Sequence, residues 1–430
     1  MKIKDLLIVS ILFGLICFGC KEPENGPAKE EVDYVKVRST LYSVEVPAPE
    51  AETYAINLTT EQQAYVKNGN DFAFRLMKLI RQKDKGSFVF SPLSIQYALM
   101  VAANAAQGET AQELLSFLAI GDNVDAINEY SKTLLEQLAA VDFDVKVQMA
   151  SAMVMKDGFT LSQEVKETIQ NNYYTPVVTI SFREPEGASV VNEWFRQRTE
   201  NALADIMAYD SPQPTVCYLL SGMHYKANWN RPFVGILEDA PFYADSGEQH
   251  IDYFNQGFLQ YLATLDKGRI LMFKNGKSGF NFNILLPTEG NSLDSVLAPL
   301  EETSWTNALK HNIQWAGCYT TIPVLATESS YKLKDIINEV PMKAFDSGLA
   351  DFSALVSEPD FYLDDILHKA KVSVGNTGVS PGTGVIGKSA ISQPSGSDGI
   401  DDIVADHPFA YFITEQTSGA IILAGVFAGE

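Results

Sequence analysis

Cysteine and histidine are scarce in this sequence. Its 430 residues include four cysteines and five histidines. Only Cys217 and Cys318 lie beyond the first 20 residues, and two cysteines do not make a disulfide framework. The histidines are scattered, and no two share the spacing of a zinc site. We therefore expect neither a metal nor a cofactor.

Basic residues are also in short supply. Lysine and arginine total 32 against 54 aspartates and glutamates, a formal net charge of −22. Such a chain is repelled by phosphate backbones and anionic lipid surfaces, which excludes nucleic acid as a favoured partner. Long apolar runs are missing as well. Residues 6–18 are almost wholly apolar, but thirteen residues are too few to span a bilayer as a helix.

The N-terminus has the pattern of an export signal. Two lysines precede the apolar residues 6–18, as in a signal peptide. Gly19 and Cys20 then resemble the lipobox of bacterial lipoproteins, in which the cysteine is acylated and becomes the mature N-terminus. A plain secretory signal cleaved elsewhere is the alternative. We predict a lipoprotein signal peptide at residues 1–19, and a membrane contact made only through the lipid on Cys20.

Residues 20–60 are predicted to be a flexible, lipidated tether. They are rich in glutamate, proline and lysine and show no sustained apolar period. Glu22 and Glu24 match either a surface-export signal of some bacterial groups or simple linker composition. The expected location is the cell envelope, at the outer membrane, with display on the cell surface left open.

Residues 61–430 read as one large α+β domain, because long apolar strands occur with helices grouped around them. Helical spacing of apolar residues covers 70–80, a stretch from Ser94, 111–118, 124–138, 162–172 and 188–207. Apolar strand-like stretches cover 88–90, 145–155, 215–227, 280–286, 366–374 and 409–427.

A long polar loop separates the last two of these strands. Of the 26 residues from Gly378 to Ile403, fourteen are glycine, serine, proline or threonine. A loop this long inside a compact domain is usually functional or disordered. The sequence therefore makes this loop the leading candidate for the functional site.

Two enzyme-like interpretations of the chain fail. Residues 382–388 have the form G-x-G-x-x-G-K, but a dinucleotide loop needs a helix directly after it, and residues 389–398 show no helical pattern. No G-x-S-x-G nucleophile motif occurs. We therefore expect an inhibitor or a binding protein and not an enzyme.

A series of short motifs, in order between about residues 70 and 429, resembles the serpin family of serine protease inhibitors. The motifs are FSPLSI at 90–95, AAQGET at 105–110, NEW at 192–194, YKANW at 225–229, RPF at 231–233, NILLP at 283–287, SSYKLK at 329–334, ADFS at 350–353, HKA at 368–370 and DHPF at 406–409.

The resemblance implies a serpin fold: a large central, mostly antiparallel sheet, smaller sheets, about nine helices, and an exposed reactive-centre loop at about residues 376–406. It also implies a monomer that inhibits a serine, or alternatively a cysteine, endopeptidase. The protease cuts the loop and forms an acyl-enzyme, and the loop then inserts as a strand into the main sheet. A non-inhibitory surface binding or decoy protein is the alternative.

The resemblance also assigns residues within the loop. The hinge, which would insert first, comprises Asn376, Gly378, Val379 and Pro381. Proline is unusual there, because it donates no hydrogen bond to a strand ladder. Counting from Gly378 places the reactive bond at Ser392–Gln393, with Ile391 and Lys388 as alternative sites of attack.

The last assigned group lies in the domain body. The resemblance implies a buried hydrogen-bonded cluster, the shutter, at Ser91, Ser94 and His368, with Ser221 where the family has asparagine. Trp229 is the aromatic residue near the top of the same sheet, the breach. The family has an ion pair at the top of this sheet. The resemblance places the uncharged residues Asn376 and Val324 at the two matching positions, so no charge is left without a partner.

Overall fold

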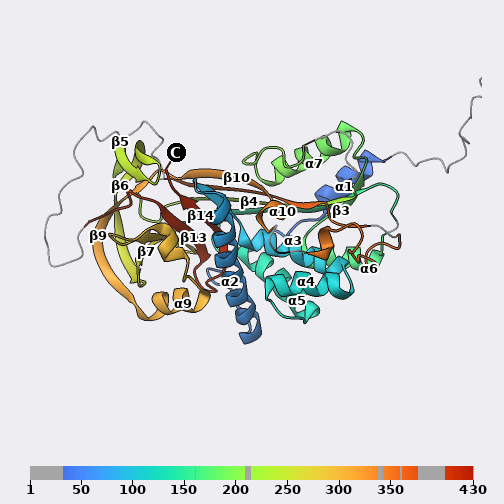
Figure 1. The fold of residues 1–430 in the computed structure, drawn as a ribbon, viewed down its shortest axis with the longest axis horizontal. Coiled ribbons are helices and arrows are strands. Elements are labelled where there is room, and N and C mark those ends of the chain that lie inside the picture. The colour runs from blue at the N-terminus through green and yellow to red at the C-terminus, as the bar shows by residue number, and fades with distance from the viewer. Residues whose placement is uncertain are drawn as a thin grey trace, which may run out of the picture.

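The computed structural model describes residues 32–159, 161–208, 215–337, 340, 342–358, 361–375 and 402–429. These residues form two sheets and a set of helices, which confirms the predicted α+β fold (Figure 1). None of the described helices has the length and apolarity of a membrane span. The described helices are α1 (Tyr34–Ser43), α2 (Thr60–Lys83), α3 (Pro92–Ala105), α4 (Gly108–Leu118), α5 (Val124–Leu138), α6 (Gln163–Tyr173), α7 (Pro185–Arg198), α8 (Leu293–Leu297), α9 (Glu302–His311), α10 (Leu333–Ile336) and the 3₁₀ helix η1 (Lys343–Phe345).

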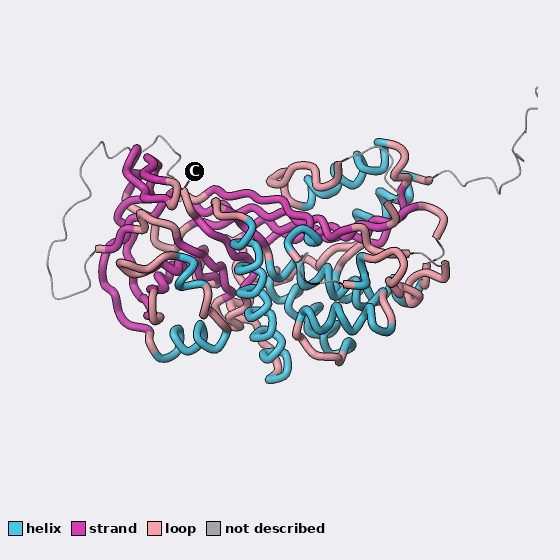
Figure 2. The backbone as a smooth tube through the Cα atoms, viewed as in Figure 1, coloured by secondary structure: helices cyan, strands magenta, loops and turns pink. Residues whose placement is uncertain are grey.

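A five-stranded sheet runs lengthwise through the molecule (Figure 2). Helices α1 and α7 lie on one of its faces, and α3 to α6 lie on the other side (Figure 1). Pairing alternates between antiparallel and parallel, and the central pair β11–β4 is parallel. The strands, in order across the sheet, are β10 (Ala326–Lys332), β11 (Asp365–Gly375), β4 (Cys217–Asn228), β2 (Lys146–Lys156) and β3 (Val177–Ile180).

A second, nine-stranded sheet packs at one end of the first. Its pairs are antiparallel except for β12 with β9. The strands, in order, are β1 (Phe88–Phe90), β14 (Ile421–Phe427), β13 (Phe409–Glu415), β8 (Phe280–Pro287), β7 (Gly268–Asn275), β6 (Gly247–Thr264), β9 (Ile313–Pro323) and β12 (Ile403–Val404), and β5 (Gly235–Ala244) pairs with β6.

Helix α2 shows how local sequence and packing agree. Thr59 caps its N-terminus in a reciprocal capping box with Gln62. Its apolar face buries Phe72, Phe74 and Leu76 in the main core cluster. The predicted periodicity at residues 70–80 is confirmed, and the cap extends the helix ten residues further toward the N-terminus.

Two predicted boundaries are wrong. The helix predicted for residues 188–207 ends at Arg198, because Glu200 and Asn201 adopt left-handed φ values of 48° and 61°. The strand predicted for residues 409–427 is a hairpin of β13 and β14. Its turn is held by the Glu415 carboxylate, which accepts hydrogen bonds from the backbone N–H of Thr417 (2.9 Å) and Ser418 (2.6 Å).

The second part of the predicted tether is not a tether, because residues from 32 onward pack on the domain. The Asp33 side chain caps α1. Val37 and Leu41, one turn apart, are buried in a cluster with residues of α7 and β3. Arg198 at the end of α7 pairs with Glu45 at 2.8 Å. The residues of α1 show no sustained apolar period, so the sequence did not predict this helix. The burial of Val37 and Leu41 depends on the surface that α7 and β3 provide.

This packing makes Val37→Asp a destabilising change. The Val37 side chain is 7% exposed, whereas Val35 on the same helix is 77% exposed. Removing a buried valine costs about 2 kcal/mol, and the unpaired charge adds to that loss. We expect a lower thermal midpoint and rapid proteolysis of residues 44–58 in Val37→Asp. The matched control, Val35→Asp, should behave like wild type. Equal midpoints for both variants would contradict the packing of α1.

Candidate functional site: the seam between β4 and β11

The predicted loop leaves the domain from a central strand. β11 pairs with β4 in parallel and without a register shift, from Asp365 opposite Tyr218 to Gly375 opposite Asn228. Gly375 is the last described residue before the loop. On the far side of the loop, β12 pairs with β9 of the other sheet. The two ends of the loop are therefore anchored in different sheets.

Side chains alternate across β11. Ala370, Val372 and Val374 lie in the main core. Lys371 faces the other way, where its Nζ pairs with Glu328 of β10 at 3.0 Å and donates to the Ala202 carbonyl at 3.1 Å. The sequence analysis missed this ion pair. The alternation of lysine with apolar residues in β11 is the signal that could have indicated an exposed face.

Four buried polar side chains join the two strands to helix α3. The shutter residues Ser221 and His368 lie directly opposite each other on β4 and β11. Ser91 is the N-cap of α3, and its Oγ accepts from the Ser94 N–H at 3.1 Å. Pro92 follows at the first helical position, which favours a helix start at this point. The capping geometry thus places both serines under the seam, and the structure brings all four predicted residues together.

The bonding pattern assigns the tautomer of His368. The Ser91 backbone N–H donates to Nε2 at 3.0 Å, so Nε2 is an acceptor and the proton lies on Nδ1. Nδ1 is 3.1 Å from Ser221 Oγ, which donates in turn to Ser94 Oγ at 3.0 Å. Burial lowers the pKa of His368 to about 3, so the ring is neutral at physiological pH. Serine at position 221 therefore serves as a complete partner where the family has asparagine.

Trp229 lies at the loop end of the seam. Its backbone N–H donates to the Gly375 carbonyl at 3.1 Å. The indole is 3% exposed, and its N–H has no acceptor among the described residues. Trp229 therefore ties the last residue before the loop to an aromatic core. Four rings surround the indole with centroid distances of 5.3 to 6.1 Å: Phe233, Phe254, Phe273 and Phe282.

Helix α7 covers the seam by a close contact that the sequence analysis also missed. At Gly222, the residue after Ser221, an added Cβ would lie 2.4 Å from the Phe195 ring. Only glycine leaves room for that ring on the strand. A glycine inside an apolar strand is the signal for such an approach.

Several predicted residues lie outside the described ranges, and Val324 lies inside them. The Val324 N–H donates to the Asp252 carbonyl at 2.9 Å, just before β10. The predicted residues outside the described ranges are Cys20, the hinge residues Asn376, Gly378, Val379 and Pro381, and the candidate reactive residues Lys388, Ile391, Ser392 and Gln393.

Comparison with known proteins identifies the class to which this fold and seam belong. The sequence model of the family described as Serpin (serine protease inhibitor) matches residues 67–429. The chain belongs to the serpin family.

Related sequences cover most of this chain. An uncharacterized serpin-like protein of Thermococcus kodakarensis is 27% identical and covers 98% of both chains. Iripin-3 of Ixodes ricinus is 26% identical over 83% of this chain and 92% of its own length. Human Serpin B8 is 25% identical over 83% and 97%.

Solved structures share the fold. The native state of the thermophilic serpin Tengpin superposes with a TM-score of 0.76 at 20% identity, covering 91% of this chain and 98% of that one. Human thyroxine-binding globulin, solved with its hormone, gives a TM-score of 0.75 at 20% identity, covering 86% and 99%.

Proposed function

We propose that this chain inhibits serine endopeptidases, with cysteine endopeptidases as a further target class, by trapping the protease after it cuts the loop. The observation that carries the proposal is the parallel β4–β11 pair beside the start of the loop. A chain that turns back after Gly375 runs antiparallel to both strands. Its insertion would replace one parallel ladder with two antiparallel ladders, which are slightly more stable per residue.

The shutter supports the same proposal. Its bonds join β4 to β11 through Ser221 and His368, so the strands separate only after this buried contact opens. A satisfied buried network is expensive to break. The network would therefore keep β4 and β11 paired until the cut loop can form hydrogen bonds with both strands. The free energy that insertion releases would then be available only after cleavage.

The direct test is to incubate the protein with single proteases and to analyse the products on denaturing gels. We expect a covalent complex, with the mass of protease plus cleaved chain, for an elastase- or subtilisin-like enzyme acting near Ile391–Ser392. Trypsin should act only at Lys388 within the loop. Mass spectrometry should place the first cut between Lys388 and Asp398.

The matched control is the same protease blocked at its catalytic serine, which cannot form the acyl bond. Cleavage of the loop by every active protease, with no covalent complex, would refute the inhibitor proposal and favour a non-inhibitory binding protein. A first cut outside residues 388–398 would refute the assigned reactive bond.

We also propose that the chain is a lipoprotein held at the outer membrane of a bacterium through Cys20. The apolar residues 6–18 and the Gly19-Cys20 pair support this proposal. In a bacterial host, Cys20→Ala should move the protein from the membrane fraction to the soluble fraction or leave it unprocessed. Cys17→Ala is the control and should remain in the membrane. A soluble wild-type protein with an unacylated N-terminus would contradict the anchor.

A further inference from the structure

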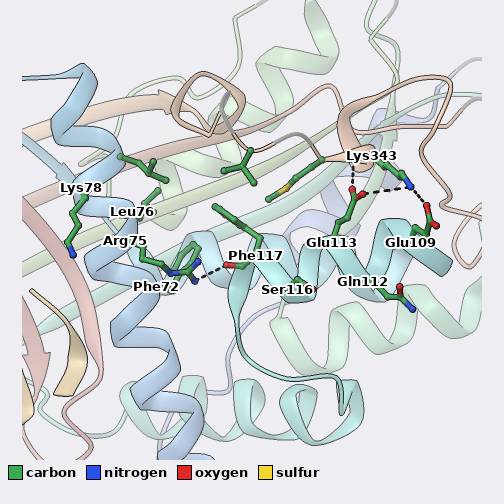
Figure 3. Close-up of a pocket in the computed structure, with 13 residues that line it drawn as sticks. Phe72, Arg75, Leu76, Lys78, Glu109, Gln112, Glu113, Ser116, Phe117 and Lys343 are labelled. Atoms are coloured by element: carbon green, nitrogen blue, oxygen red, sulfur yellow. Dashed lines mark hydrogen bonds and ion pairs between the residues drawn. The ribbon is translucent and has the colours of Figure 1, made fainter. Parts of the chain in front are cut away.

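A groove separate from the seam opens between α2, α4 and the residues Val340, Met342 and Lys343 (Figure 3). Its volume is about 980 Å³, at the upper end of the range for small-molecule sites. The middle of the groove is apolar, and Phe72 and Phe117 meet edge to face within it at 5.7 Å. The apolar lining residues are Phe72, Leu76, Leu79, Phe117, Val340 and Met342.

One end of the groove is cationic. The Arg75 guanidinium lies 5.7 Å and 5.8 Å from the ring centroids of Phe72 and Phe117. Its Nη2 donates to the Phe117 carbonyl at 2.8 Å (Figure 3). Nε and Nη1 have no hydrogen-bond partner in the described part of the chain. Lys78 lies one turn further along α2 and donates to the Leu300 carbonyl at 2.8 Å.

The charges around the groove are unevenly compensated. At the far end of the groove, Lys343 forms an ion pair with Glu109 and a second one, at 3.8 Å, with Glu113 (Figure 3). Both carboxylates at that end therefore have a positively charged partner. Near the cationic end, the charge of Asp71 acts on both Arg75 and Lys78, while its carboxylate accepts from the Glu302 backbone N–H at 2.8 Å and makes no direct ion pair with Arg75 in the described part of the chain. Arg75 therefore retains free donors at the edge of an apolar surface, in a chain whose net charge is −22.

We propose that this groove binds an amphipathic carboxylic acid of the long-chain fatty acid type. The hydrocarbon would cover Leu76, Phe117 and Met342, and a carboxylate oxygen would accept from an Arg75 N–H that is not bonded to the Phe117 carbonyl. A hydrogen bond between a guanidinium and a carboxylate is charge-assisted on both sides, which makes it stronger than a bond between neutral groups. The apolar lining gives affinity through burial, and Arg75 gives the preference for an acid. The proposal does not depend on protease inhibition.

The test is a fluorescence titration of the purified chain with a dansyl-labelled long-chain fatty acid and with its methyl ester. We expect saturable binding of the acid at micromolar concentration and weaker binding of the ester. Arg75→Gln should weaken acid binding at least about tenfold and leave ester binding unchanged, because a charge-assisted pair is lost. Ser116→Trp, on the exposed groove side of α4, should fill the groove and weaken both probes.

Arg38→Gln is the matched control, since it removes an exposed arginine of α1 far from the groove, and it should change neither titration. Arg75 also binds the C-terminal carbonyl groups of α4, so a thermal melt must show that Arg75→Gln stays folded; if it does not, Ser116→Trp decides. The proposal is overturned if wild type shows no saturable binding, if acid and ester bind equally, or if Ser116→Trp binds both probes as wild type does.

Discussion

Replacing Pro381 with alanine is expected to raise the share of protease encounters that end in a covalent complex. In the proposed mechanism, insertion of the cut loop competes with hydrolysis of the acyl-enzyme. Proline has no N–H, so its insertion beside β4 or β11 leaves one carbonyl without a ladder partner. A buried hydrogen bond left unmade costs about 1–3 kcal/mol. If that cost falls on the insertion barrier, wild-type insertion is slower by about 5- to 150-fold.

The measurement is the number of inhibitor molecules consumed per protease trapped, which should fall in Pro381→Ala. The loop-cleaved variant should also have a higher thermal midpoint than the cleaved wild type, because its inserted strand regains a bond. Pro394→Ala is the matched control: it lies beyond the assigned reactive bond and would not enter the sheet. Identical partitioning of wild type and Pro381→Ala would show that the sheet accommodates the proline, for example by a bulge.

Acidification is expected to destabilise the domain through His368. Burial lowers the pKa of His368 to about 3 in the folded chain, against about 6.5 when unfolded. Below the unfolded value, the unfolded chain binds a proton that the folded chain does not. Neutral His368 therefore makes its full contribution to the free energy of unfolding above about pH 7.5. That contribution decreases as the pH falls toward the pKa of the folded state. The loss by about pH 5 is about 2 kcal/mol from this residue alone.

The variant that isolates this effect is His368→Gln, which remains polar and does not titrate. Urea unfolding at about pH 8 and about pH 5 should show a pH dependence in wild type that exceeds that of the variant by about 2 kcal/mol. The difference between the two proteins matters, because other histidines also contribute. Burial lowers the pKa of His224 to about 4, whereas Asp406 raises the pKa of His407.

His311→Gln is the control for the loss of a histidine, since its side chain is exposed. It should retain the full pH dependence of wild type. If His368→Gln and wild type lose the same stability on acidification, the neutral ring is not what makes the shutter sensitive to acid.

The sequence alone was sufficient for features that depend on local pattern and motif order. Apolar periodicity predicted α5 at its observed bounds and located β11 within one residue at each end. The motifs predicted the family, and they also selected Ser91, Ser94, Ser221 and His368, which the structure joins in one network. The helix and the strand follow from backbone periods of 3.6 and 2 residues, which are visible in a single chain. The four shutter residues follow from the resemblance to the family.

Other features were decided only by contacts between distant segments. Val37 and Leu41 become core residues because α7 and β3 offer them a surface. Gly222 is required because the Phe195 ring lies on it. The groove beside Arg75 exists because Val340, Met342 and Lys343 approach two helices more than 200 residues earlier in the chain. Burial depends on which surfaces meet in three dimensions, and a pattern of neighbouring residues contains no information about that meeting.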